Sequence, residues 1–351
     1  MIVFSYISIY LLFIFFQIVN KKKYQRLSIF ILIIFSILIV LLDYGKIIGT
    51  DYETYNLTFN RLLFEKKIPK FYIKDSGWLL KVYFYFIGKI YPDFKLAMVI
   101  LILFHNSIIY YFFKKFNYNN LFYFSVLTYF CFFYIQNSFN ALKQSVAICF
   151  FAISLKYIYE KKILKYMLNI IFGGLYHTLL LIFFPIYFIL NKIIKHKILI
   201  FLFVISCLFI IFLKKNIMLV GNIFKDNMRY YKYFIGVYNS VSFNIINFFE
   251  VYLPLCLLLL LDFKSKLRKL NKKNKIFINL YYSYCFLYLL TIIDKLMGYR
   301  FILFLSIGYS IIYPYIFYEF FKFLKFKKGF IIFYSIWLLC FLYLRNIRYI
   351  S

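Results

Sequence analysis

The hydrophobic positions of this chain fall into long, nearly unbroken runs and do not alternate with polar ones. Strands of a membrane barrel alternate apolar and polar residues, whereas continuous apolar stretches are typical of membrane-crossing helices. Such runs lie at about 2–19, 27–42, 95–113, 119–135, 140–158, 163–175, 178–190, 198–213, 246–262, 277–293, 301–318 and 329–345. The pattern predicts an all-α, polytopic membrane protein with about twelve transmembrane helices, forming a single domain over residues 1–351.

Two segments admit more than one interpretation. Segment 78–91 is either a short span or, because it is aromatic and carries Lys81 and Lys89, an amphipathic helix at the membrane interface. Segment 163–190 is long enough for one helix, but a Gly-Gly pair and His177 fall in its middle. We favour an interfacial helix in the first case and two short helices meeting at a polar tip in the second.

The charge of the chain is strongly asymmetric, with 43 Lys+Arg against 12 Asp+Glu and a net charge of +31. The strongest basic loops lie between apolar runs, at 20–26, 264–275 and 322–328. Membrane proteins retain basic loops on the cytoplasmic side, and this retention explains the excess of Lys and Arg. No nucleic acid is therefore expected as a partner. This orientation puts both termini outside, together with two larger outer loops at 43–94 and 214–245.

The composition excludes several other classes of protein. Hydrophobic residues make up 65% of the chain, well above the share in soluble domains. The six cysteines are scattered and form no C-x-x-C pair, so neither a metal site nor a disulfide framework is expected. The chain has no Walker loop, no G-x-G-x-x-G, no G-x-S-x-G and no H-E-x-x-H, and we expect no cofactor.

The first outer loop contains the run G-T-D-Y-E-T-Y, in which Asp51 is followed by Tyr52 and Tyr55. If this run is helical, Asp51 and Tyr55 share a face. A carboxylate at the edge of an apolar cavity can take a proton from a sugar hydroxyl, and tyrosines offer flat faces for sugar rings. The alternative is that Asp51 is a solvated loop charge.

Asn140, Lys143 and Gln144 are spaced i, i+3 and i+4 at the start of an apolar run. On one helical face they would present two amides and an ammonium near the positive end of the helix dipole. That arrangement suits a phosphate or pyrophosphate. The alternative is an ordinary first turn with a lysine reaching toward the interface.

Two further ionisable residues lie beside apolar runs on the predicted outer face. His177 follows the Gly-Gly pair, and Arg300 ends the segment D-K-L-M-G-Y-R that begins with Asp294. Arginine binds phosphate with two parallel hydrogen bonds, and ionisable groups at membrane depth are candidates for function. The alternatives are a packing role for His177 and an interfacial anchor for Arg300. His105 and His196 look ordinary.

Together these short motifs resemble the EpsG family of bacterial exopolysaccharide and O-antigen polymerases, the Wzy-like proteins. The resemblance rests on G-x-D-x-x-x-Y (Gly49, Asp51, Tyr55), N-x-x-[RK]-Q (Asn140, Lys143, Gln144), a basic turn at Lys161 and Lys162, H-x-x-L-L at His177, Pro185 and Arg300. The family usually has arginine where this chain has Lys143, so the charge is kept but the bidentate fork is lost. The layout is also similar to lipid-linked glycosyltransferases of the GT-C type.

The resemblance implies an enzyme that polymerises lipid-linked oligosaccharide repeat units on the outer face of the bacterial inner membrane. A glycan would move from undecaprenyl pyrophosphate to the terminal hydroxyl of another repeat unit. The implied partners are the lipid-linked glycan, membrane lipid, a flippase and a chain-length regulator. The alternatives are a glycosyltransferase that adds one sugar from a polyprenyl phosphate, a glycan-modifying transferase, and, in another class, a polysaccharide flippase.

Each candidate residue has an expected role in that reaction. We expect Asp51 to act as general base or to position the acceptor, and His177 and Arg300 to bind the departing pyrophosphate together with Lys143. The expected substrate-binding residues are Tyr52, Tyr55, Asn140, Lys143 and Gln144.

Overall fold

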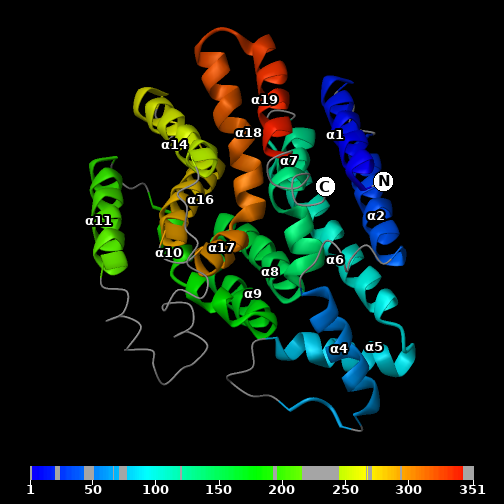
Figure 1. Ribbon diagram of the computed structural model, residues 1–351. Coiled ribbons are helices and arrows are strands. Elements are labelled where there is room, and N and C mark those ends of the chain that lie inside the picture. Colours follow the sequence, from blue (N-terminus) through cyan, green and yellow to red (C-terminus); the bar gives the residue numbers. More distant parts are fainter. Residues whose placement is uncertain are drawn as a thin grey trace. The chain divides into compact units, whose positions relative to one another are not determined.

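The computed structural model is built from helices, and no strand occurs among the residues that it describes (Figure 1). The described residues are 2–19, 24–42, 51–65, 67–70, 77–118, 121–192, 196–215, 245–265, 267, 271–292 and 295–342. The predicted all-α class is confirmed. Residue contacts group the chain into unit 1, Met1–Tyr187 with Tyr313–Ser351, and unit 2, Phe188–Ile312. A single membrane domain stays a prediction.

Most helices belong to unit 1. In chain order they are α1 (Ile2–Val19), α2 (Tyr24–Leu41), α4 (Tyr52–Phe64), α5 (Trp78–Ile90), α6 (Phe94–Phe116), α7 (Phe122–Tyr129), the π-helices η1 (Phe130–Tyr134) and η2 (Gln136–Asn140), α8 (Leu142–Tyr159), α9 (Ile163–Tyr176), the 3-10 helix η3 (Thr178–Phe183) and α19 (Lys327–Leu342). Unit 2 contains α11 (His196–Lys215), α14 (Ile245–Ser265), α16 (Lys272–Tyr288), η4 (Leu289–Ile292) and α17 (Lys295–Phe304). Two helices have residues in both units, α10 (Ile186–Leu190) and α18 (Ser306–Phe323).

Helices long and apolar enough to cross a membrane are few in the described part of the chain. By length and composition α2 and α6 qualify, and a third candidate is the pair 298–304 and 306–323, which is bent by 75°. Several shorter apolar helices accompany them, among them α9 and most of α1. The apolar helices indicate a membrane protein, while the number of twelve spans stays a prediction.

The core of unit 1 is lined with tyrosines whose hydroxyl groups bond inside the protein. The Tyr134 hydroxyl lies 3.1 Å from Asn106 Oδ1 and 3.2 Å from the carbonyl oxygen of Leu32. Buried hydroxyl groups need such partners because water does not reach them. These bonds join η1 to α2 and α6.

The described part of the predicted first outer loop, 43–94, contains α4 and α5. The two helices pack through Phe59 and Phe84, whose ring centroids are 5.6 Å apart. At 13 residues, α5 is about 20 Å long, which is shorter than the roughly 30 Å hydrocarbon core of a bilayer. Its length supports an interfacial helix over a span. Residues 43–50, 66 and 71–76 of this loop lie outside the described residues, as do 216–244 of the second outer loop.

Segment 163–190 is broken at the predicted place. Helix α9 ends at Tyr176, His177 is extended with φ −151° and ψ 109°, and η3 follows. The chain then turns back along α9, and the Tyr166 hydroxyl donates a hydrogen bond to the Phe183 carbonyl. Gly173 permits this close return, since a Cβ there would lie 2.3 Å from a Leu180 methyl group. The prediction of two short elements meeting at a tip is confirmed.

Unit 2 is organised around α16. The ring of Tyr309 in α18 lies 4.4 Å from that of Tyr284 in α16, centroid to centroid, and the Tyr281 hydroxyl donates to the Val251 carbonyl at 2.9 Å. At the far side of α16, Asn279 Nδ2 donates to the Lys192 carbonyl at 2.6 Å. These contacts hold α14, α16 and the chain after α10 together.

Candidate functional site

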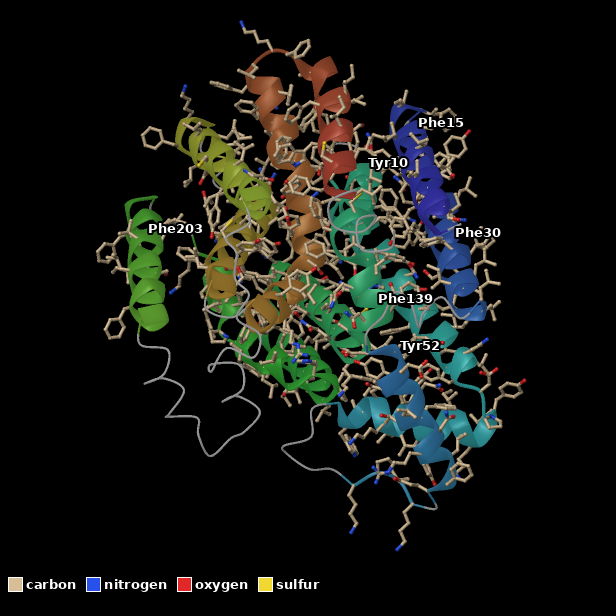
Figure 2. All side chains as sticks on the ribbon, in the orientation of Figure 1. Tyr10, Phe15, Phe30, Tyr52, Phe139 and Phe203 are labelled. Carbon is tan, nitrogen blue, oxygen red and sulfur yellow. The ribbon has the colours of Figure 1, made fainter. Side chains whose placement is uncertain are left out.

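Asn140 joins the first outer loop to the end of η2. The backbone N–H of Asp51 donates to Asn140 Oδ1 at 3.1 Å, and Asn140 Nδ2 donates to Gln136 Oε1 at 3.1 Å. Figure 2 shows Tyr52 and Phe139, the neighbours of these two residues, at the same junction. The two motifs that lie far apart in the sequence are therefore in direct contact.

Asp51 is the residue at which α4 begins. It is half-buried, and the Tyr55 N–H donates to its carbonyl at 3.1 Å, so the two residues lie one helical turn apart as predicted. The Asp51 carboxylate makes no capping hydrogen bond to α4. The start of this helix is fixed by its backbone and by Asn140, and the carboxylate is not used for it.

Tyr52 and Tyr55, the predicted sugar contacts, face the protein interior. Their exposed fractions are 1% and 6%. The Tyr52 ring packs edge-on against Phe94 at a centroid distance of 5.2 Å. The Tyr52 ring attaches α4 to α6, and contact with a sugar stays a prediction for both tyrosines.

The prediction that Asn140, Lys143 and Gln144 share one face of a helix start is wrong. Asn140 closes the π-helix η2, in which the Ala141 N–H donates to the Gln136 carbonyl at 2.9 Å. Ala141 then leaves helical geometry with φ −113° and ψ 51°, and α8 starts at Leu142. Lys143 and Gln144 remain in the first turn of α8. Single π-turns within helices are frequent at functional sites, and here η2 follows a first π-turn, η1.

The stem of Lys143 lies against Gly77, the residue that precedes α5. A Cβ at Gly77 would be 2.4 Å from Lys143 Cδ, and Gly77 has φ +101°. Glycine is required here on both counts, because other residues rarely adopt this φ and a side chain would displace the lysine. The contact brings the first turn of α8 to the start of α5.

The starts of α4, α5 and α8 therefore meet at one junction, through the Asp51–Asn140 hydrogen bond and the Gly77–Lys143 contact. Each helix start carries backbone N–H groups without partners inside the helix and a partial positive charge. The helix dipole also disfavours an ammonium group in a first turn. A bound anion would offset this repulsion and would satisfy the free N–H groups. The arrangement is suited to a phosphate or pyrophosphate.

His177 reaches the same end of α8 from α9. The two helices are antiparallel, and Gly173 packs against the backbone of Ala147. His177, the first residue after α9 and four positions beyond Gly173, therefore lies near the start of α8, where Lys143 is four positions before Ala147. Its side chain is half-buried.

Helix α9 also packs against α5, one of the helices that form the junction. Phe150 stacks on Tyr176 with ring centroids 5.9 Å apart. The Tyr83 hydroxyl donates to the Ala97 carbonyl at 2.7 Å, and burial raises the pKa of Tyr83, with Tyr176 nearby raising it further. Phe150 thus attaches the end of α9 to α8, and the proximity of Tyr83 to Tyr176 places it beside α5.

Arg300 belongs to unit 2 and is half-buried on α17. Close backbone packing defines the start of this helix, where a Cβ at Gly298 would be 2.4 Å from the Thr291 nitrogen. Gly49 of the first motif and Asp294 lie outside the described residues. The contacts described above bring Asp51, Asn140 and Lys143 of unit 1 together, and Arg300 belongs to the other unit.

A buried polar network was missed by the sequence analysis, which treated His105 as ordinary. His105 Nε2 lies 2.8 Å from the Tyr129 hydroxyl, and His105 Nδ1 lies 2.7 Å from Ser145 Oγ. Asn137 Nδ2 donates to the same Tyr129 hydroxyl at 2.7 Å. The network connects α6, α7, η2 and α8, and so holds the two segments that flank Ala141. The adjacent polar pair at His105 and Asn106 inside an apolar run was the available signal.

Within the described residues, no three His, Cys, Asp or Glu side chains gather in a way that could hold a metal ion.

Comparison with known proteins gives a family match to this chain. No curated protein and no solved structure matches the chain. The EpsG family matches it over residues 28–351, which is nearly its whole length. The chain is a member of the EpsG family.

Proposed function

We propose that this protein is a Wzy-like polymerase of lipid-linked oligosaccharide repeat units. Membership of the EpsG family supports a polysaccharide polymerase. The observation that carries the proposal is the junction of three helix starts, to which Asp51 contributes through Asn140 and Lys143 through Gly77. It combines an anion site with a carboxylate, which are the two groups that transfer from a pyrophosphate to a hydroxyl requires.

The reaction exchanges one bond at the anomeric carbon of the donor glycan. The terminal hydroxyl of the acceptor repeat unit attacks this carbon, and the bond to the pyrophosphate oxygen breaks. Asp51 takes the proton of the attacking hydroxyl, and the lipid pyrophosphate leaves with the electron pair of the broken bond. The helix starts and Lys143 bind the negative charge that collects on the leaving group.

The remaining candidates support that step in different ways. His177 adds a hydrogen-bond donor at the end of α9, while Arg300, which belongs to unit 2, stays a candidate from its sequence pattern alone. Tyr52 fixes α4 on α6 through Phe94, which keeps the Asp51 residue in place, and Tyr55 is buried on the same helix. No nucleotide is needed, because the pyrophosphate is already the leaving group.

The proposed active face is the outer face of the bacterial inner membrane. The opposite ends of α6 and α8 carry Lys114, Lys115 and the turn 160–162 with its two lysines, and retention of these charges inside would put the junction outside. A flippase would deliver the substrate to this face, and a chain-length regulator would act on the product.

The test uses cells that lack the gene. Wild-type protein should restore long chains, whereas Asp51→Asn should leave one repeat unit on the lipid, since loss of a general base slows a reaction by about 10²–10⁴-fold. Asp51→Asn keeps the backbone N–H that binds Asn140. Glu53→Gln, an exposed carboxylate on the same helix, is the matched control and should restore polymer.

Other outcomes would identify another function. If the knockout makes full-length chains that lack one sugar or one substituent, the protein is a single-addition or modifying transferase. If lipid-linked repeat units accumulate on the inner leaflet, it is a flippase. Long chains made by Asp51→Asn at the wild-type level would contradict the role given to the carboxylate.

A further inference from the structure

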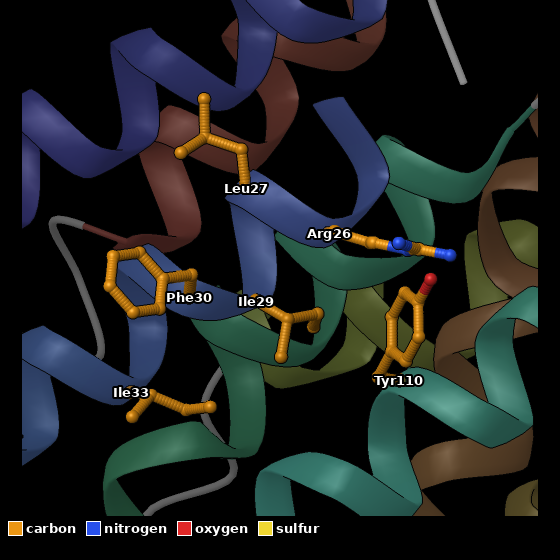
Figure 3. A pocket seen from close by; sticks show the side chains of 6 residues that line it. All are labelled: Arg26, Leu27, Ile29, Phe30, Ile33 and Tyr110. Atoms are coloured by element: carbon orange, nitrogen blue, oxygen red, sulfur yellow. The ribbon is translucent and has the colours of Figure 1, made fainter. Parts of the chain in front are cut away.

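An apolar groove of about 450 Å³ lies on unit 1 between α2 and α6. Figure 3 shows its lining residues, which are Arg26, Leu27, Ile29, Phe30, Ile33 and Tyr110. The walls are aliphatic and aromatic, and the polar atoms of the lining side chains are concentrated at one end, where Arg26 and Tyr110 point toward each other. The groove is open to the outside, and Phe30 is 56% exposed.

The groove is distant from the candidate site. Helices α2 and α6 are antiparallel, since Lys95 Nζ donates to the Leu41 carbonyl at 3.2 Å while Arg26 faces Tyr110. Lys95 follows Phe94, the residue on which Tyr52 packs. The 15 positions from Lys95 to Tyr110 correspond to about 22 Å along α6. The groove thus lies near the opposite end of this helix from the junction.

The polar end of the groove carries more positive charge than Arg26 alone. Lys114 Nζ lies 5.5 Å from the centroid of the Tyr110 ring. A guanidinium, an ammonium and a phenol hydroxyl at one place match the oxygens of a phosphate group.

Apolar walls that end in a phosphate-binding group fit an amphiphile with an anionic head. The two helices that form the groove are also the two single helices of the described chain that are long and apolar enough to cross a membrane. An open groove on such helices faces acyl chains, which can enter it sideways. Free phosphate would leave the apolar walls in contact with water, and a peptide would lose its backbone hydrogen bonds against them.

We propose that this groove binds an anionic glycerophospholipid of the bilayer, with its phosphate at Arg26 and Tyr110 and one acyl chain along Ile29, Phe30 and Ile33. Positive charge at this end of α2 and α6 is typical of the cytoplasmic leaflet, where anionic headgroups attract basic residues. The lipid stabilises the pair α2–α6 at the end opposite the site. The inference does not depend on the proposed enzymatic activity.

The test measures lipid retention by native mass spectrometry of the full chain, purified in detergent and supplied with phosphatidylglycerol. A charge-assisted contact contributes enough that Arg26→Gln should weaken retention by about tenfold. Arg26→Lys, which keeps the charge and loses the fork, should weaken it less. Arg61→Gln removes the same charge from an exposed residue of α4 and should leave retention unchanged.

Two further arms separate a lipid site from other ligands. Phosphatidylcholine should bind more weakly than phosphatidylglycerol, and Ile33→Asn should weaken phosphatidylglycerol binding by altering the wall and not the charge. Equal retention by wild type and Arg26→Gln would overturn the proposal. It would also be overturned if the two phospholipids bind alike, if inorganic phosphate displaces phosphatidylglycerol, or if only a polyprenyl phosphate is retained.

Discussion

His105 and His177 occupy opposite kinds of surroundings within unit 1. His105 is 2% exposed, and its two ring nitrogens are 2.8 Å and 2.7 Å from the hydroxyl groups of Tyr129 and Ser145. His177 is half-buried at the point where the chain leaves α9, level with the start of α8. The first histidine belongs to a buried network, and the second lies at the end of α9 near the start of α8.

This difference distinguishes a histidine that stabilises the fold from one that is positioned to act in a reaction. Both are ionisable groups in an apolar chain, and that property alone marks each as a candidate. The hydrogen-bond partners distinguish them, because a network that closes on itself in the interior fixes helices and has no access to a substrate. The variants below are expected to affect activity and stability in opposite ways.

Among the variants that probe this comparison, the largest effect is expected for His177→Ala on polymer formation. Loss of one hydrogen bond to a charged leaving group should lower the rate by about 10–100-fold. The melting temperature should stay within experimental error, since His177 is outside the closed network. Chain-length analysis and thermal unfolding of the same purified variant measure both. Thr178→Ala, at the exposed next position, is the control, and normal polymer from His177→Ala would remove His177 from the site.

The reverse pattern is expected for His105→Leu. Removing the imidazole leaves the buried hydroxyl groups of Tyr129 and Ser145 short of a partner, which should reduce the free energy of unfolding by about 2–4 kcal/mol. Thermal unfolding in detergent measures the loss. Ser107→Ala on the same helix, where the exposed hydroxyl bonds only within the helix, should change little. An unchanged melting temperature for His105→Leu would show that the network does not hold these helices.

A smaller effect is expected for Gly77→Ala. A side chain at φ +101° is strained by about 1–3 kcal/mol, and the methyl group would also displace the Lys143 stem. Polymer formation should fall several-fold with a modest loss of stability. In the double variant Gly77→Ala/Lys143→Ala, the clash with the lysine stem disappears. Lys143→Ala should therefore lower stability less in the Gly77→Ala variant than in the wild type. Additive losses of stability would argue against the Gly77–Lys143 contact.

The smallest effect is expected for Glu160→Gln, in the turn between α8 and α9. Its carboxylate lies 2.9 Å from Lys162 Nζ and 3.6 Å from Lys115 Nζ. The hydrogen bond from Lys162, with further help from Lys156 and Lys115, lowers the pKa of Glu160. Any stability from it is present at neutral pH and is lost as the pH falls through that lowered value. Exposed pairs contribute little, so the melting temperature at pH 7 should be unchanged. A clear drop would mean that this turn is more important than its exposure indicates.

The sequence was sufficient to predict the elements that depend on local pattern. Apolar runs place the helices, the Gly-Gly pair before His177 places the break after α9, and the spacing of Asp51 and Tyr55 puts them on one face. Each of these features depends on the size or polarity of side chains within a few residues of one another. Composition and periodicity therefore predict them directly.

What could not be predicted depends on contacts or on backbone detail. A π-turn at η2 and an α-turn differ by one residue in their hydrogen bonding, which periodicity does not resolve, so Asn140 was placed on α8. The bond from Asp51 to Asn140 joins residues 89 positions apart. Tyr52 looked like a ligand contact because its burial against Phe94 arises only when α4 meets α6.

The most direct test of the central claim is polymerisation by the purified full chain in lipid nanodiscs. Undecaprenyl-pyrophosphate-linked repeat unit is supplied as the sole glycan, with no nucleotide added, and the products are separated by size. Wild-type protein should give a ladder of glycans longer by whole repeat units and should release undecaprenyl pyrophosphate. The Asp51→Asn variant should give no ladder. Repeat units that stay single with folded wild-type protein would contradict it.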